Sequence, residues 1–298
     1  MDFALYRTIA EQQGVFTTAQ ARESHSEWEI RGLVAAGRWR RSPWRGVLVD
    51  GDLPDSPALH VRAAALVVGP DLVACHSTAA ALWGFDVLGP ATLHFLGPPQ
   101  LGNRSRPGIQ VHPSSLGTDD AVLVDGVWAT PAARTACDVV RLTAPIHGLA
   151  TLDAALRAGA CTREELLAAS AAQAGLRGVA RLRELVPLAD HRAESPMESR
   201  MRWRFIAGGL PAPDLQIEVP VDGMRRLLDT GWRRWRVGAE YDGLIAHGSR
   251  EQLRSDRYRA NQLTGTRWTL LHFTDVDVYR RPHQMVTTVT RACGMGRR

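Results

Sequence analysis

Residues 237–247 read VGAEYDGLIAH, and they place two acids one residue apart behind an apolar approach. Side chains alternate between the two faces of a strand, so Glu240 and Asp242 are expected to point the same way. Taken alone, the stretch favours a solvated strand end that runs into a turn, because Asp-Gly is a strong turn dipeptide. The sequence on either side of it supports a different interpretation.

The C-terminal third has the pattern of an α/β core with a mixed sheet. A helix is expected to begin at Ser195, with Pro196 at its first position and Glu198 at its third in a capping-box arrangement. Strands are then predicted at 215–221, 225–230, 234–242 and 266–274, a basic helix at 249–265 and a closing helix at 275–292. The helix comes first and the first three strands follow it without interruption.

Acidic side chains converge in this arrangement. The hairpin between the second and third strands brings Asp229 close to Glu240, and Glu198 joins them if its helix packs across the sheet. Converging carboxylates repel one another unless a cation neutralises them, and an oxygen-only ligand set suits Mg²⁺ or Mn²⁺ better than zinc. We therefore predict a metal site formed by Asp229, Glu240 and Asp242. Such an ion beside a basic groove suits phosphodiester hydrolysis, with His247 as a general base or as a group that steadies the leaving oxygen.

The same stretches resemble the very-short-patch-repair (Vsr)-like branch of the PD-(D/E)xK nuclease superfamily. The similar segments are ESPMESRMR, RRLLDT, GAEYDG followed by His247, and SDRYRANQLTGTRWTLLHFT. The resemblance implies a restriction-endonuclease-like core in which Glu198, Asp229 and Glu240 are the catalytic acids. Asp242 stands where most of the superfamily has lysine, and this chain contains no lysine. The alternative is a non-catalytic DNA-binding regulator or antitoxin with a degenerate nuclease fold.

The first fifty residues have the order of a winged helix-turn-helix. A helix is predicted at 3–13, a second capped by Thr17 or Thr18, and a third capped by Ser26 and ended by Gly37. The third helix has an apolar pattern of Trp28, Ile30, Leu33 and Val34, and a hairpin over 38–50 follows it. The predicted phosphate contacts are Arg31, Arg38, Arg40, Arg41 and Arg45, together with Arg254 and Arg257 of the basic helix. A winged helix used only for protein contacts is the alternative.

The segments GVFTTAQAR, IRGLVAAGRWRR and RGVLV resemble the N-terminal winged-helix domain of AbiEi-type antitoxins from abortive-infection systems. The resemblance implies DNA binding, often to the protein's own promoter. Residues 57–190 resemble the region that follows in such proteins: short strands, a helix from Ser77 or Thr78, and a mostly helical stretch over 146–188. We interpret Cys75, next to His76, as a buried cysteine beside a helix cap, because neither residue has a sequence partner at metal spacing.

The composition limits the expected partners, compartment and kinds of site. The net charge of +5 divides into +1, −3 and +7 over residues 1–50, 51–190 and 191–298, so a polyanion is expected to bind towards the C-terminal end. The four cysteines are far apart, which argues against a disulfide framework or a zinc site, and we see neither a signal peptide nor a membrane span. We therefore expect a cytoplasmic protein in three parts, with the boundaries 1–50, 51–190 and 191–298. Its expected partners are DNA and a protein from a toxin–antitoxin or defence operon, and its expected context is phage defence, toxin–antitoxin control or DNA repair.

Overall fold

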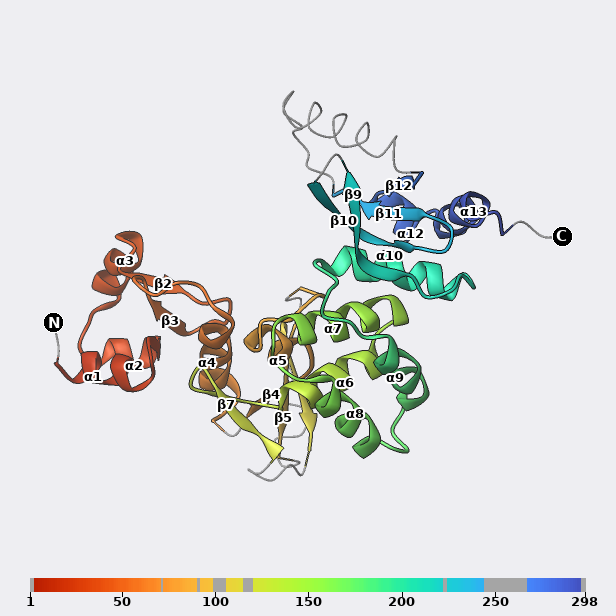
Figure 1. The fold of residues 1–298 in the computed structure, drawn as a ribbon. Coiled ribbons are helices and arrows are strands. Elements are labelled where there is room, and N and C mark those ends of the chain that lie inside the picture. Colours follow the sequence, from red (N-terminus) through yellow and green to blue (C-terminus); the bar gives the residue numbers. More distant parts are fainter. Residues whose placement is uncertain are drawn as a thin grey trace. The chain divides into compact units, whose positions relative to one another are not determined.

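The computed structural model describes residues 3–70, 72–89, 92–98, 106–114, 120–221, 224–243 and 267–295 (Figure 1). The chain divides into two compact units, Met1–Asp138 and Val139–Arg298, and the division falls inside helix α6 (Ala132–Leu142). Each unit mixes helices with strands, so the predicted mixed α/β class is confirmed. The three-part division of the sequence remains a prediction.

The first unit begins with three helices and a small sheet. The elements are α1 (Phe3–Glu11), β1 (Val15–Thr17), α2 (Thr18–Arg22), α3 (Glu27–Ala35), β2 (Trp39–Arg41) and β3 (Val47–Asp50), and the strand order is β1-β3-β2. Thr17 and Ser26 cap α2 and α3 in reciprocal capping boxes, which confirms both predicted helix starts. The hairpin of β2 and β3 is also confirmed. Strand β1 was not predicted, because three residues are too few to show alternation.

Both faces of this sheet are covered. Phe16 and Leu48 pack against the three helices, in a cluster that includes Ile30. On the opposite face, Val15, Val47 and Val49 pack against Leu59 and Ala63 of α4 (Pro57–Val68). The sheet is therefore an internal layer.

The exposed side of α3 differs from the sequence expectation. Trp28 is 77% exposed, although its spacing suggested that it belongs to the apolar face. Ile30 alone of the four apolar residues is fully buried, while Leu33 and Val34 are half-buried. A large aromatic ring is thus left on the surface of this helix.

A five-stranded sheet completes the first unit. Its elements are β4 (Val73–Ala74), α5 (His76–Leu82), β5 (Leu93–Gly97), β6 (Ile109–Pro113), β7 (Val122–Val124) and β8 (Val127–Ala129), and the strand order is β6-β5-β4-β8-β7. Its core contains Phe95, Ile109 and Val111, together with Val61 from α4. Helix α5 begins at His76, one residue before the predicted start, because Cys75 is the N-cap.

The second unit starts with a helical layer, as predicted. It comprises α7 (Pro145–Arg157), α8 (Arg163–Ala172), α9 (Val179–Leu185) and the 3₁₀ turn η3 (Val186–Leu188). Helix α10 (Pro196–Ala207) packs against α7 and also against the C-terminal sheet. None of the helices within the described ranges is long and apolar enough to cross a bilayer.

The C-terminal sheet is mixed, which confirms that part of the prediction. Strands β9 (Asp214–Val221), β10 (Met224–Trp232) and β11 (Val237–Tyr241) are antiparallel, and β12 (Thr269–Phe273) pairs parallel with β11, in the order β12-β11-β10-β9. The predicted closing helix is in fact two helices, α12 (Asp275–Tyr279) and α13 (Pro282–Ala292). Pro282 explains the break, because proline has no N–H to continue α12 and is favoured at the start of a helix.

Candidate functional site

Asp229 and Glu240 lie on adjacent strands of one hairpin, at the end of the ladder away from its turn. Thr230 pairs with Ala239 in the β10–β11 ladder, which places Asp229 beside the Glu240–Tyr241 peptide. The backbone N–H of Tyr241 donates to Asp229 Oδ2 over 3.2 Å. The predicted approach of the two acidic positions is therefore present.

Glu198 comes to this region from α10. Ser195 caps the helix by accepting the N–H of Glu198, and Pro196 occupies the first turn. The carboxylate of Glu198 accepts the N–H of Glu194 over 2.9 Å, where the capping-box prediction required the N–H of Ser195. Only 8% of Glu198 is exposed, and burial raises the pKa of its carboxyl group.

The strongest electrostatic perturbation in this region falls on Asp229. Burial, followed by the negative charge of Glu198 and then by that of Glu240 and Glu194, raises the pKa of Asp229 to about 7. The hydrogen bond from Tyr241 opposes the rise without cancelling it. A carboxyl group perturbed by burial and by neighbouring negative charges is a candidate for a functional site.

Glu240 and Asp242 have basic partners that the sequence did not reveal. Arg226 Nη2 lies 3.4 Å from Glu240 Oε1, and both side chains are largely buried. His272, opposite Glu240 in the β11–β12 register, places Nδ1 3.1 Å from Asp242 Oδ1 and 4.0 Å from Glu240 Oε2. His272 comes from β12, which is distant in sequence, so local spacing could not identify it. Arg226 lies on the neighbouring strand of the same hairpin.

The donor chemistry of these acids fits a hard cation, since every candidate ligand is a carboxylate oxygen. Asp229 and Glu240, with Asp242 beside them, are the residues that would hold it. Within the described residues, however, these acids do not bring three ligand atoms within 4.8 Å of one another. Their metal-binding role stays a prediction. His247, Arg254 and Arg257 lie outside the described residues.

The predicted phosphate contacts of the first unit differ in exposure. Arg31, Arg38, Arg41 and Arg45 are exposed. Arg40 is half-buried, and its Nη2 donates to the carbonyl oxygen of Leu53 over 2.5 Å. Arg40 thus holds the chain that follows β3 as well as lying on the basic surface.

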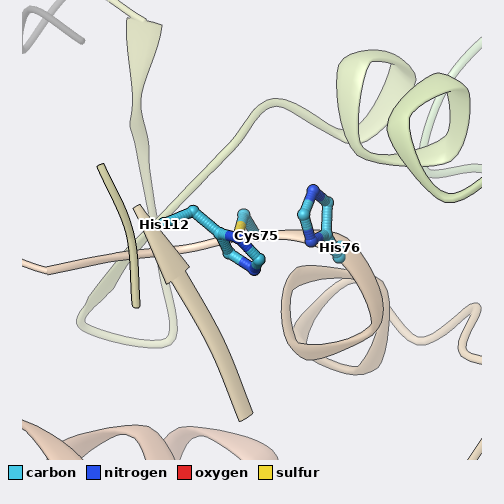
Figure 2. A group of neighbouring side chains, drawn as sticks. All are labelled: Cys75, His76 and His112. Carbon is cyan, nitrogen blue, oxygen red and sulfur yellow. The ribbon is translucent and has the colours of Figure 1, made fainter. Parts of the chain in front are cut away.

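A cysteine and three histidines gather on the five-stranded sheet. One ligand atom each from Cys75, His76 and His112 lie within 4.8 Å of one another, and Figure 2 shows their side chains converging. His94 Nδ1 lies 3.1 Å from His112 Nε2, and their rings are stacked. Burial lowers the pKa of both His94 and His112. Cys75 is buried, as predicted, but it is itself the N-cap of α5 and not a residue beside the cap. Strands β5 and β6 bring it partners that its own stretch of sequence does not show.

Comparison with known proteins identifies relatives that match most of this chain. Two proteins of Mycobacterium tuberculosis are each 40% identical to it over 254 residues, which cover 83% of this chain and 90% of the relative. They are Uncharacterized protein MT2308 of strain CDC 1551 / Oshkosh and Uncharacterized protein Rv2248 of strain ATCC 25618 / H37Rv. The chain belongs to their family. Neither name states an activity for the family.

A model of the AbiEi antitoxin C-terminal domain matches residues 72–188. The match confirms the AbiEi-like character of the middle region, from β4 to η3. It does not extend to residues 1–50, nor to the acid-bearing strands after residue 188. The winged-helix resemblance of residues 1–50 and the Vsr-like resemblance of the C-terminal strands remain predictions for this chain.

Proposed function

We propose that this protein is a DNA-binding regulator of the toxin–antitoxin type. The observation that carries the proposal is the exposed basic surface of the first unit. Arg31 lies on α3, Arg38 lies directly before β2, and Arg41 is the last residue of β2. An arginine-bearing helix followed by an arginine-bearing hairpin suits the groove and backbone of duplex DNA.

Two further observations support the proposal. The element order of residues 3–50 fits a winged helix-turn-helix, in which α3 would be the recognition helix and the β2–β3 hairpin the wing. The AbiEi antitoxin domain at residues 72–188 suggests a partner protein from the same operon. Trp28, exposed on α3, adds an aromatic surface next to Arg31.

The test is binding of the full chain to duplex DNA from its own promoter and to unrelated duplex, measured by fluorescence anisotropy at several salt concentrations. Affinity should fall steeply as salt rises, because phosphate contacts release counterions. Arg31→Ala combined with Arg41→Ala should weaken binding to both duplexes. Arg7→Ala is the matched control, since Arg7 is also exposed but pairs with Glu11 on α1. Equal binding by the double variant and the wild type would exclude this surface as the DNA-binding site.

A second proposal, metal-dependent cleavage of DNA, rests on a separate observation, the raised pKa of Asp229 among Glu198 and Glu240. A Mg²⁺ or Mn²⁺ ion held by Asp229 and Glu240, with Asp242 as a further ligand, would supply water activation and charge neutralisation at a phosphodiester. Helix α10 followed by three antiparallel strands and a parallel fourth also supports the predicted nuclease-like order.

The protein's own groups have distinct tasks in this second proposal. Arg226 orients the carboxylate of Glu240 from the neighbouring strand. His272 Nδ1 lies beside the carboxylates of Asp242 and Glu240 from β12 and restrains both side chains. The N–H of Tyr241 fixes one oxygen of Asp229. The acids are thereby held in place before any substrate binds.

Nicking of supercoiled plasmid by the full chain in Mg²⁺, Mn²⁺ or EDTA tests the second proposal. Cleavage should require a metal and should be lost in Glu240→Gln and Asp229→Asn. Glu218→Gln is the control, because Glu218 is an exposed acid on β9 paired with Arg225. A wild type that binds DNA but cleaves none under any of these conditions would leave the regulator as the function.

A further inference from the structure

The cysteine–histidine cluster occupies one face of the five-stranded sheet. Phe95 and Val111 point into the apolar core, so their strand neighbours His94 and His112 lie on the opposite face. Ala74 also belongs to that core, and the next residue, Cys75, donates its N–H to the carbonyl oxygen of His94 over 3.0 Å. Alternation along three adjacent strands therefore delivers a thiol and two imidazoles to one place.

Helix α5 adds the third imidazole. His76 follows Cys75 directly and has a φ of 49°, in the left-handed region that a residue with a Cβ seldom adopts. This turn starts α5 beside β4 and leaves the His76 ring 4.8 Å from the ring of His112. Cys75 makes no side-chain hydrogen bond as the N-cap, so its sulfur is not engaged in capping the helix.

The donor set decides which ions fit. One sulfur and several imidazole nitrogens, with no carboxylate among them, suit zinc and exclude a preference for Mg²⁺ or Ca²⁺. Zinc is bound tetrahedrally at about 2.0–2.1 Å from nitrogen and about 2.3 Å from sulfur, which places neighbouring ligand atoms about 3.3–3.6 Å apart. The separation of 3.1 Å between His94 Nδ1 and His112 Nε2 is already near that spacing.

We propose that Cys75, His76 and His112 bind a zinc ion, with His94 as the fourth ligand. The ion links the end of β4 and the start of α5 to strands β5 and β6. The ligand atoms of Cys75, His76 and His112 lie within 4.8 Å of one another, so they must close by at most about 1.5 Å, which rotation of the side chains supplies. His94 lies outside that group of three and joins it through its neighbour His112. Arg134 and Asp138, an ion pair on α6 with 3.6 Å between Nε and Oδ2, stand close enough to influence the thiol electrostatically and would surround the site.

Metal analysis of the untagged full chain after gel filtration tests the proposal. Wild type should retain about one zinc ion per chain, because all four ligands lie on a folded scaffold. Cys75→Ser and His112→Gln should lose it. Cys161→Ser and His147→Gln are matched controls that should keep it, since Cys161 is likewise a buried free thiol and His147 a half-buried histidine.

Cobalt substitution keeps the test decisive if a ligand variant folds poorly. Co²⁺ added to metal-free wild type should give thiolate-to-cobalt charge-transfer absorption and tetrahedral visible bands, and both should be absent in Cys75→Ser and unchanged in Cys161→Ser. Zn²⁺ should raise the thermal midpoint of metal-free wild type, because it binds only the folded state. A wild type without bound zinc, cobalt absorption or a thermal shift would show that the cluster is only a hydrogen-bonded group, and the proposal would fail.

Discussion

Arg202 of α10 and Asp153 of α7 form a buried ion pair, in which Nη2 alone donates to both carboxylate oxygens, over 2.8 Å and 2.7 Å. Their side chains are 6% and 0% exposed. Asp153 Oδ1 also accepts the N–H of Asp190 over 2.8 Å, and Arg202 Nη1 donates to the carbonyl oxygen of Leu188 over 2.9 Å. The helix that carries Glu198 is thus fixed to the helical layer by charge as well as by packing.

Removing one partner of this pair should destabilise the second unit. Asp153→Ala leaves Arg202 buried without its counter-charge, so we expect a loss of about 3–5 kcal/mol in the free energy of unfolding. Urea unfolding measures it. Asp190→Ala, which removes a more exposed pair with Arg192, should cost about 1 kcal/mol. Equal losses in the two variants would contradict the structural role of Asp153.

The same pair predicts the behaviour of a shortened chain. A fragment of residues 191–298 contains Arg202 but lacks Asp153, so the guanidinium group of Arg202 has lost its counter-charge. This fragment should unfold more readily than a fragment of residues 139–298. Thermal melts of the two fragments compare them directly. If the shorter fragment melted at the same temperature, the predicted boundary at residue 191 would be supported.

Asp229 should make stability depend on pH. Its pKa is raised from 3.8 to about 7, so the folded protein binds more protons than the unfolded chain between those values. The free energy of unfolding therefore falls as pH rises through that window, and the full penalty applies above it. The free energy of unfolding of Asp229→Asn should exceed that of the wild type by on the order of 2 kcal/mol at pH 8, after allowance for solvent screening. At pH 4 the two should differ little. Asp214→Asn, at an exposed acid on β9, should show no such difference.

Arg40 and Arg41 of the hairpin are expected to have different roles. Arg41→Ala should weaken DNA binding and leave the thermal midpoint unchanged, because Arg41 is exposed. Arg40→Ala should lower the midpoint as well, since it removes the hydrogen bond to Leu53. The loss should be about 1 kcal/mol in unfolding free energy. Identical effects of the two substitutions on stability would argue against the role of Arg40 in holding the chain after β3.

Asp242 can be tested by reversing its charge. If position 242 acts as the lysine position of the superfamily, Asp242→Lys should retain or increase any metal-dependent nicking. If Asp242 is a metal ligand, the new positive charge should repel the ion and abolish nicking. Asp242→Asn, assayed over a range of Mn²⁺ concentrations, should then be partly rescued. The two substitutions together assign the residue, because each role gives a different pair of results.

Local chemistry explains what the sequence could predict. The starts of α2 and α3 follow from capping boxes within four residues, and the β10–β11 hairpin follows from alternation on either side of a short turn. The approach of Asp229 to Glu240 needed only that hairpin. Such features depend on residues close together in the chain.

Long-range pairing explains what the sequence missed. His272 contacts Asp242 because β12 pairs parallel with β11. The ligand atoms of His112 and Cys75 come within 4.8 Å of each other because β6 and β4 flank β5 and present these residues on the same face. The wide spacing of the four cysteines argues against a zinc site built from cysteines alone, whereas histidines from other strands can also supply ligands. Trp28 was misplaced because helical spacing alone does not show which face a neighbouring element covers.

Helix α4 has a consequence for how the first unit can be divided. One side of it covers Val15, Val47 and Val49, and another side contributes Val61 to the core of the five-stranded sheet. A chain cut after residue 50 would present those three valines to water and should associate with itself or yield to proteases. We expect both sheets to melt in one cooperative transition, so that the smallest autonomous carrier of the basic surface is the whole of residues 1–138. A change that loosens the five-stranded sheet, without altering any arginine of the hairpin, should therefore weaken DNA binding.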